Sequence, residues 1–184
     1  YKIYIKSQDD LNAVYRPKVK GAITLDKATQ KLKLDFIVLF SSGAAEMGSM
    51  GQADYAAANA FMDTYCVYRN SLVSKGERSG KMISINWPLW KEGGMRVNDK
   101  IEQVLFRDSG MIPINSQNGI KLLYKALQTD LSHIIVLAGN LRLIKNKLEN
   151  RMDSKENYNC SIAPEIKDII INLKQIFADV TKLS

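Results

Sequence analysis

One stretch of this 184-residue chain, FIVLFSSGAAEMGSMGQADYAAAN from Phe36 to Asn59, constrains its fold more than any other. It opens with the apolar run Phe36–Phe40, continues through two serines and a glycine-rich loop, and ends in an alanine-rich segment. The apolar run predicts a parallel strand covered on both faces, and the high helix propensity of residues 53–60 predicts a helix directly after the loop. The chain is therefore expected to have an α/β fold.

Two more apolar runs, Met82–Trp87 and Ile134–Ala138, predict a second and a third strand. Helical patterns lie between the runs, which indicates βαβ units with right-handed crossovers. The expected helices are one capped by Asp9 and Asp10 that reaches Leu25, one from Asp54 to Ser74 with Gly76 at its carboxyl end, and one capped by Ser116 that reaches Ala126.

Polar side chains are expected to meet where the first strand ends. Ser42 closes that strand, and Tyr55 and Asn59, spaced i and i+4, share one face of the following helix. Ligands of open α/β sheets bind at this edge, where a hydroxyl, a phenol and an amide can polarise a carbonyl group. A tyrosine ordinarily titrates near pH ~10, so it needs a neighbouring cation to donate its proton at neutral pH. Lys18, in the segment RPKVKG, is the candidate cation, although most helix lysines are simply solvated.

Lys18, Ser42, Tyr55 and Asn59 resemble the catalytic set of the ketoreductase domains of modular polyketide synthases. These domains belong to the short-chain dehydrogenase/reductase superfamily, where a lysine usually follows the tyrosine by four residues. In the polyketide branch an asparagine takes that position and the lysine lies upstream, as in this chain. The segments YRPKVKGAITLDKAT, GQADYAAANAFMD and ISINWPLWKEGGM are similar to the same family, and the last most resembles enzymes of the trans-acyltransferase type.

The resemblance implies NADPH-dependent reduction of a β-ketoacyl thioester, held on an acyl carrier protein, to the β-hydroxyacyl thioester. It implies that Tyr55 protonates the nascent alkoxide and that Ser42 hydrogen-bonds the carbonyl oxygen. It further implies that Lys18 stabilises the tyrosine phenolate and, with Tyr55, contacts the cofactor, while Asn59 orients the lysine and a relay water.

Weaker expectations concern the surroundings of this group. Pro88 and Leu89, in NWPLW, are candidates for contact with the nicotinamide by resemblance, whereas the rings of Trp87 and Trp90 are expected to be core aromatics. Met47, Gln52 and Met95 are candidates for contact with the substrate. Residues 91–111 are expected to form a mobile lid lined by Ile101, Val104, Leu105 and Met111.

The loop before the tyrosine bears on stereochemistry. In the family that this chain resembles, members that give the L-configured 3-hydroxyl product share a tryptophan eight residues before the tyrosine. This chain has Met47 at that position. A flexible thioether cannot form the same rigid wall, so the D-configured product is expected. Asp54, where the family commonly has asparagine, weakens this match.

The glycine-rich dinucleotide fingerprint of the superfamily is absent from this sequence. The resemblance therefore implies the carboxyl-terminal half of a Rossmann-type parallel sheet with flanking helices, whose missing amino-terminal half is a partner. Residues 1–143 are assigned to the ketoreductase, 144–163 to a polar linker and 164–184 to an isolated helix. That helix resembles the first helix of an acyl carrier protein, and a dimerisation or docking helix is the alternative.

The net charge of +7 and the isoelectric point near 9.3 invite a nucleic-acid-binding interpretation. The densest basic cluster, Arg142–Arg151, has no interleaved aromatic side chains, so a solvated linker is expected and no nucleic-acid partner. No apolar run reaches the ~18 residues of a membrane span.

The cysteines and the single histidine give no sign of a metal site. Cys66 is expected in the core and Cys160 in the linker, and two cysteines without a signal peptide suit the cytoplasm. His133 has no carboxylate or second histidine at ligand spacing, so a structural role is expected and no metal.

Two alternatives to an active polyketide ketoreductase stay open. One is a redox-silent ketoreductase-like domain that serves structure or epimerisation, which the complete set of four catalytic-type residues disfavours. The other is a fatty-acid-type ketoacyl reductase, which the expected linker and terminal helix disfavour.

Overall fold

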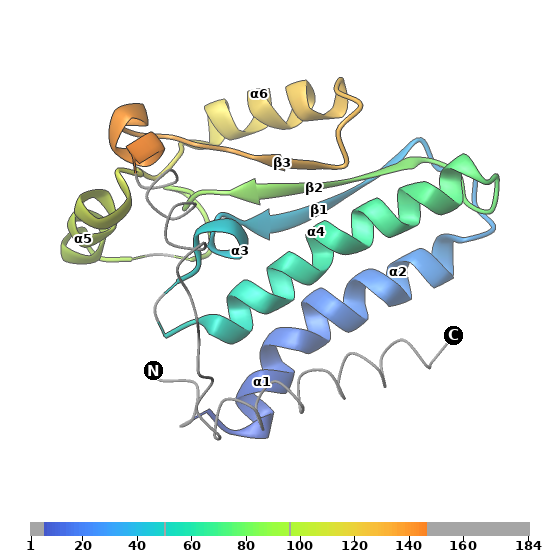
Figure 1. Ribbon diagram of the computed structural model, residues 1–184, viewed down its shortest axis with the longest axis horizontal. Helices are drawn as coiled ribbons and strands as arrows, with labels where there is room; N and C mark the ends of the chain where they lie inside the picture. The colour runs from blue at the N-terminus through green and yellow to red at the C-terminus, as the bar shows by residue number, and fades with distance from the viewer. Residues whose placement is uncertain (1–5, 50, 96, 147–184) are drawn as a thin grey trace, which may run out of the picture. The chain divides into compact units, whose positions relative to one another are not determined.

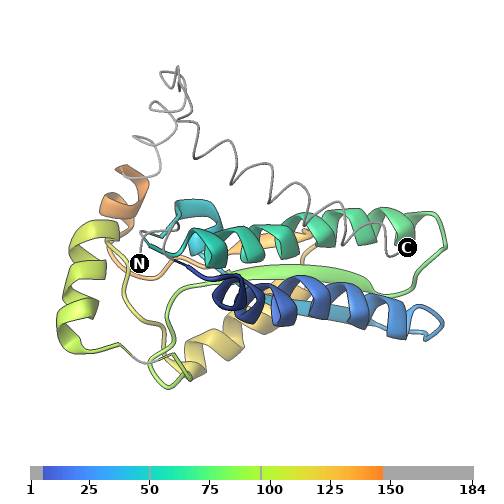
Figure 2. The ribbon, with the colours of Figure 1, turned by 90° about the horizontal axis from the view of Figure 1, so that it is seen from below.

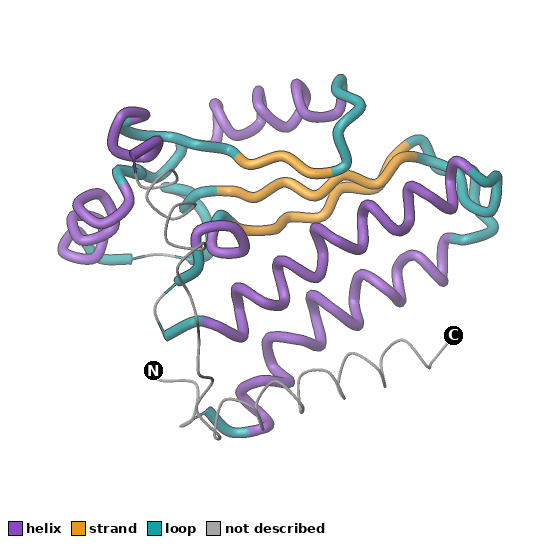
Figure 3. The backbone as a smooth tube through the Cα atoms, viewed as in Figure 1, coloured by secondary structure: helices purple, strands orange, loops and turns teal. Residues whose placement is uncertain are grey.

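The structure, a computed structural model, describes residues 6–49, 51–95 and 97–146, with the side chain of Asp99 excepted. Three parallel strands form one sheet in the order β1-β2-β3: β1 is Phe36–Ser42, β2 is Lys81–Trp87 and β3 is His133–Ile135. Helices lie on both faces of this sheet (Figure 1, Figure 3). The expected α/β class with a parallel sheet is confirmed.

Some expectations fall outside the described residues. These are the linker beyond residue 146, Cys160 and the helix at 164–184. Ile144, with which the linker was expected to begin, is instead 1% exposed and belongs to the described body.

The register brings the ends of β1 and β2 to the same edge. β1 pairs with β2 from Phe36 opposite Lys81 to Ser42 opposite Trp87. The third strand is shorter than predicted and begins one residue earlier, at His133. After β3 the chain turns to a different neighbour, because the carbonyl oxygen of Ala138 accepts a hydrogen bond from the Ile112 N–H at 2.8 Å.

Helix α4, Ala53–Ser74, connects β1 to β2 and covers one face of the sheet (Figure 1). It begins one residue before the predicted start and ends where predicted. Gly76 has a φ of +76°, and its N–H donates to the carbonyl of Val73 while that of Glu77 donates to Leu72. This is a Schellman motif, which favours glycine because a left-handed backbone strains residues with a Cβ atom.

The amino-terminal helical region has three parts: α1 (Gln8–Tyr15), the π-helix η2 (Arg16–Lys20) and α2 (Gly21–Thr29). Asp9 and Asp10 do not cap it as predicted, because Ser7 is the N-cap and Asp10 completes a capping box with it. The wide π turn includes Pro17, which has no N–H and crowds the carbonyl one turn earlier.

Alternate residues of β2 face two different cores. The core on the α4 side comprises Ala22, Ile37, Leu39, Met62, Cys66 and Met82. The core on the α6 side comprises Ile83, Ile85, Trp87, Ile114, Ala126 and Val136. Cys66 is a core residue as expected, and burial raises the pKa of its thiol to about 12, so it stays protonated at neutral pH.

β1 was expected to be covered on both faces, and within the described chain this is wrong. Ile37 and Leu39 are buried, whereas Phe36 and Phe40 are 53% and 52% exposed. The reason is that α6 (Ser116–Leu127) packs against β2, so the same face of its neighbour β1 has little cover.

Helix α6 begins at an unexpected cap. The side chain of Asn115 accepts a hydrogen bond from the Asn118 N–H at 2.9 Å, while the hydroxyl of Ser116, the predicted cap, donates to Glu92 at 2.8 Å. Trp90 packs so closely on α6 that a Cβ atom at Gly119 would lie 2.3 Å from its ring. Trp87 is 4% exposed and its ring meets that of Trp90 edge-on, so both act as core aromatics as expected.

Two further elements are α3, Ala44–Met47, after β1, and α5, Asp99–Ser109, after β2. None of the described helices is long and apolar enough to cross a lipid bilayer.

A buried ion pair holds α2 against α4, which run side by side (Figure 1, Figure 2). The carboxylate of Asp26, 1% exposed, accepts hydrogen bonds from Arg69 at 2.7 Å, Arg78 at 3.1 Å and the Tyr65 hydroxyl at 3.0 Å. Arg69, fully buried, also donates to the carbonyls of Ser79 and Gly80. The pair therefore joins α2, α4 and the turn before β2.

We expect Arg69→Met to lower the free energy of unfolding by about 3 kcal/mol. The substitution leaves the buried carboxylate of Asp26 with only Arg78 and the Tyr65 hydroxyl as partners. Urea denaturation followed by tryptophan fluorescence measures this. Arg107→Met is the matched control, since Arg107 pairs with Asp108 at the surface, where the side chains are 77% and 60% exposed. Equal unfolding midpoints for the two variants would contradict the role given to Arg69.

Candidate active site

Three of the four predicted catalytic residues are in direct contact. The ammonium of Lys18 donates to Asn59 Oδ1 at 2.8 Å, and the Asn59 Nδ2 donates to the backbone carbonyl of Tyr55 at 2.8 Å. Lys18 Nζ lies 5.0 Å from the centroid of the Tyr55 ring. Asn59 is fully buried, so its amide fixes the lysine next to the tyrosine.

Elements far apart in sequence position this group. Lys18 comes from the π turn η2, whereas Tyr55 and Asn59 occupy successive turns at the start of α4. The hydroxyl of Ser41 donates to the backbone carbonyl of Asn59 at 3.3 Å, which ties α4 to the end of β1. The predicted common face of Tyr55 and Asn59 is thus anchored to the sheet.

Ser42 lies at the carboxyl end of β1, opposite Trp87 of β2. Its oxygen accepts a hydrogen bond from the Ala44 N–H at 3.2 Å. This contact uses an oxygen lone pair and leaves the hydroxyl proton available for donation. Ser42 is therefore at the edge where ligands of parallel sheets bind, as the sequence predicted.

Burial changes the acidity of Lys18. Removal of the ammonium from water lowers the pKa of Lys18 below its ordinary value of 10.5, and the nearby negative charge of Asp63 partly opposes this. Lys18 is thus less solvated than a surface lysine.

Asp63 is a residue that the sequence analysis missed. It is 7% exposed and accepts hydrogen bonds from Ser84 Oγ at 2.6 Å and Asn86 Nδ2 at 3.1 Å, both on β2. A signal was present in the sequence, since Asp63 follows Asn59 by four residues and Tyr55 by eight on one helix. A charged side chain on the buried face of an amphipathic helix indicates a hydrogen-bonding or oppositely charged partner.

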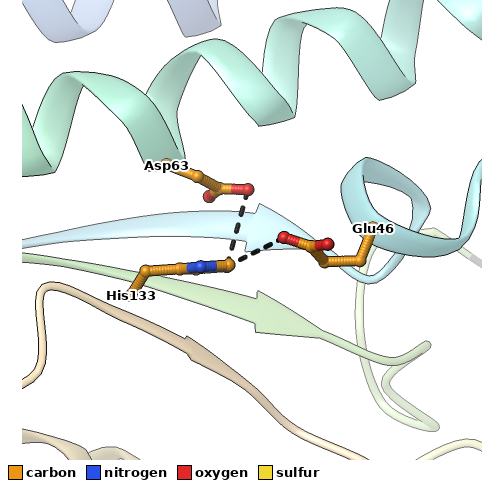
Figure 4. Close-up of side chains that lie close together, drawn as sticks. All are labelled: Glu46, Asp63 and His133. Atoms are coloured by element: carbon orange, nitrogen blue, oxygen red, sulfur yellow. Dashed lines mark ion pairs between the residues drawn. The ribbon is translucent and has the colours of Figure 1, made fainter. Parts of the chain in front are cut away.

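His133 lies close to two carboxylates, contrary to the reasoning from sequence spacing. Its Nε2 is 3.6 Å from Asp63 Oδ2 and 3.8 Å from Glu46 Oε1, and the three side chains converge from β3, α4 and α3 (Figure 4). Their donor atoms lie within 4.8 Å of one another, close enough to hold a metal ion. The distances from His133 Nε2 are longer than hydrogen bonds, and we assign no metal to the three side chains.

The structure describes the positions of the remaining candidates. Pro88 is buried directly beyond β2, and the carbonyl of Leu89 accepts a hydrogen bond from the Ile114 N–H at 2.8 Å. Met47 ends α3, and Gln52 precedes α4 and accepts a hydrogen bond from Ser49. Met95 is 56% exposed in the loop before α5, and its contact with a substrate stays a prediction.

The expected lid has exposed apolar side chains. On α5, Ile101, Val104 and Leu105 are 46%, 45% and 42% exposed. Met111, the fourth expected lining residue, instead forms a backbone bridge with Gly139. Motion of this segment stays a prediction.

Comparison with known proteins gives a consistent result. Residues 3–92 match the family model described as KR domain. Over 151 residues, 82% of this chain, the sequence is 47% identical to polyketide synthase PksN of Bacillus subtilis strain 168, and it spans 3% of that protein. Polyketide synthase PksL of the same strain is 43% identical over 73% of the chain, which again spans 3% of the relative.

Solved structures agree with the sequence relatives. A ketoreductase domain from the bacillaene assembly line is similar over 80% of this chain with a TM-score of 0.78 and 40% identity. An amino-terminal ketoreductase from the macrolactin assembly line is similar over 80% of it with a TM-score of 0.68 and 34% identity. The chain spans 36% and 27% of these two structures, so it corresponds to about a third of such a domain structure.

We expect the Lys18 ammonium to titrate below pH 10.5, the ordinary lysine value, because burial disfavours its charged form. Nitrogen-15 NMR of the lysine side chains against pH measures this midpoint, and Lys18→Arg identifies the resonance. A midpoint at or above the ordinary value would show that burial does not dominate the site.

Proposed function

The chain belongs to the ketoreductase domains of polyketide synthases, and from this premise we propose that it carries the catalytic residues for reducing a β-ketoacyl thioester. One observation supports the proposal above all: the Lys18 ammonium is hydrogen-bonded to Asn59 and lies 5.0 Å from the Tyr55 ring. A carbonyl oxygen that gains negative charge needs a proton donor and a nearby cation, and this group offers both.

In the proposed reaction, NADPH supplies a hydride to the β-carbon of the ketone when it is bound. The Ser42 hydroxyl donates a hydrogen bond to the carbonyl oxygen, and the Tyr55 hydroxyl gives that oxygen its proton. Lys18 stabilises the phenolate that remains on Tyr55. Asn59 holds the lysine through the 2.8 Å hydrogen bond and orients a water that returns the proton.

The residues of this chain fit one end of the cofactor. The Lys18 ammonium offers N–H donors for a ribose hydroxyl, and Pro88 and Leu89 lie beyond β2 at the edge where the nicotinamide is proposed to bind. The phosphate-binding glycine fingerprint is not in this sequence. We therefore propose that an amino-terminal half of the domain holds the pyrophosphate.

The substrate is proposed to be an acyl chain on the phosphopantetheine of an acyl carrier protein, within a cytoplasmic assembly line of the trans-acyltransferase type. The likeness of ISINWPLWKEGGM to that type and the similarity to PksN support this. Met47, Gln52 and Met95 are proposed to contact the acyl chain. A redox-silent domain is the alternative, and the contact of Lys18 with Asn59 beside Tyr55 disfavours it.

We expect Tyr55→Phe to reduce ketone reduction by about 10²- to 10⁴-fold in a complete ketoreductase domain that contains this chain, because the general acid is lost. The assay follows NADPH oxidation with a β-ketoacyl thioester. Tyr68→Phe is the matched control, since Tyr68 lies on the same helix and is 55% exposed. Equal turnover by the Tyr55→Phe and Tyr68→Phe variants would remove Tyr55 from the mechanism.

We expect the same domain to give the D-configured 3-hydroxyacyl product. The reason is that Met47 stands where family members that give the L-configured product share a tryptophan. Chiral chromatography of the product from a diketide thioester measures this. A mainly L-configured alcohol would show that Met47 does not report on the binding direction.

A further inference from the structure

Asp63 lies next to the proposed catalytic group but has no part in the reaction described above. Its side chain is 10% exposed, and it continues the face of α4 that carries Tyr55 and Asn59. A buried carboxylate is costly unless it is hydrogen-bonded or paired with a positive charge. The contacts that compensate Asp63 therefore indicate what it does.

Two of these contacts fix the orientation of α4. The Oδ1 of Asp63 accepts a hydrogen bond from Ser84 at 2.6 Å, and the Oδ2 accepts one from Asn86 at 3.1 Å. Ser84 and Asn86 are two residues apart on β2, are fully buried and face the same side of the sheet. A carboxylate held at both oxygens prevents rotation of α4 about its axis. It thereby sets the direction of Asn59, one turn earlier.

The remaining contacts are electrostatic. The negative charge of Asp63 raises the pKa of Lys18, against the larger lowering by burial. Asp54, a buried acid in the first turn of α4, is already paired with Lys6, which lies before α1. Arg16 and Lys20, beside Lys18 on η2, are exposed. Among the described acids, Asp63 is thus the one whose charge raises the pKa of Lys18.

His133 and Glu46 also lie near the carboxylate of Asp63 (Figure 4). His133 Nε2 lies 3.6 Å from Asp63, and Glu46, whose side chain is 50% exposed, lies 3.8 Å from the same nitrogen. Lys18 reaches the same helix one turn earlier, through its 2.8 Å hydrogen bond to Asn59 Oδ1. Glu46 has the same charge as Asp63 but is more exposed, so it provides a test of position.

We propose that Asp63 is a positioning residue of the ketoreductase site, whose buried carboxylate holds α4 on β2 and serves as the counter-charge of the Lys18 ammonium. This inference rests on the proposed function, since it deepens the role of the same group. Asp63 does not contact the reacting atoms. It keeps Lys18 charged and keeps Asn59 directed at the lysine.

The first test measures Lys18 in the 184-residue chain and needs no activity. Asp63→Asn is expected to lower the Lys18 titration midpoint in nitrogen-15 NMR by about one pH unit, because an opposite charge is lost. Asp63→Glu keeps the charge and is expected to keep a midpoint near the unsubstituted value. Glu46→Gln removes the same charge at the surface and is expected to leave the midpoint unchanged.

The second test measures ketone reduction against pH in a complete domain that contains the chain. Asp63→Asn is expected to move the alkaline fall of kcat to lower pH by the same amount, with KM little changed, and Asp63→Glu is expected to restore part of the profile. A Lys18 midpoint that moves no further in Asp63→Asn than in Glu46→Gln would overturn the inference.

The two tests separate the two proposals. Suppose that Asp63→Asn lowers the Lys18 midpoint but the unsubstituted complete domain reduces no β-ketoacyl thioester. This result would reject the proposed function and keep Asp63 as the counter-charge. Should Asp63→Asn fail to fold by circular dichroism, the comparison of Asp63→Glu with Glu46→Gln decides. A lowered midpoint in Asp63→Glu, where the charge is retained, would then contradict the inference.

Discussion

The buried ion pair between Asp26 and Arg69 is the contact on which the helical layer of this chain depends. It joins α2 to α4 and, through carbonyl groups, to the turn that leads into β2. Lys18, eight residues before Asp26, contacts Asn59, ten residues before Arg69. Because the ion pair fixes α2 against α4 at the Arg69 end, it also restricts how far Lys18 can move relative to the start of α4. A structural ion pair thus supports the geometry of the hydrogen bond between Lys18 and Asn59.

Much of the fold could be predicted from sequence because its signals are local. The apolar run of β1, the alanine-rich start of α4 and Gly76 each specify their own conformation, and the structure has them within about a residue. The spacing of Tyr55 and Asn59 predicted their common face for the same reason. Lys18 was different, since only the resemblance to a family connected it to residues about 40 positions later in the sequence.

The missed features depend on contacts between distant residues. Two cap predictions failed because neighbouring polar residues compete for the same position: Ser7 caps α1, and Glu92 engages the hydroxyl of Ser116. The exposure of Phe36 and Phe40 depends on where α6 packs, which periodicity does not encode. The approach of His133 to Asp63 and Glu46 requires that β3 lie beside β2, so sequence spacing could not reveal it.

The π turn at Arg16–Lys20 changes how this site depends on the protein around it. In the wider superfamily, the lysine and the tyrosine share one helix, so their separation is a property of a single backbone. Here Lys18 is on a different helix from Tyr55, and their proximity depends on how two helices slide along each other. The axial rise of a helix is about 1.5 Å per residue, so a slip of one residue is enough to break a 2.8 Å hydrogen bond. Substitutions in the packing between α2 and α4 are therefore expected to disturb the proposed catalytic group as well as stability, even where they lie far from it.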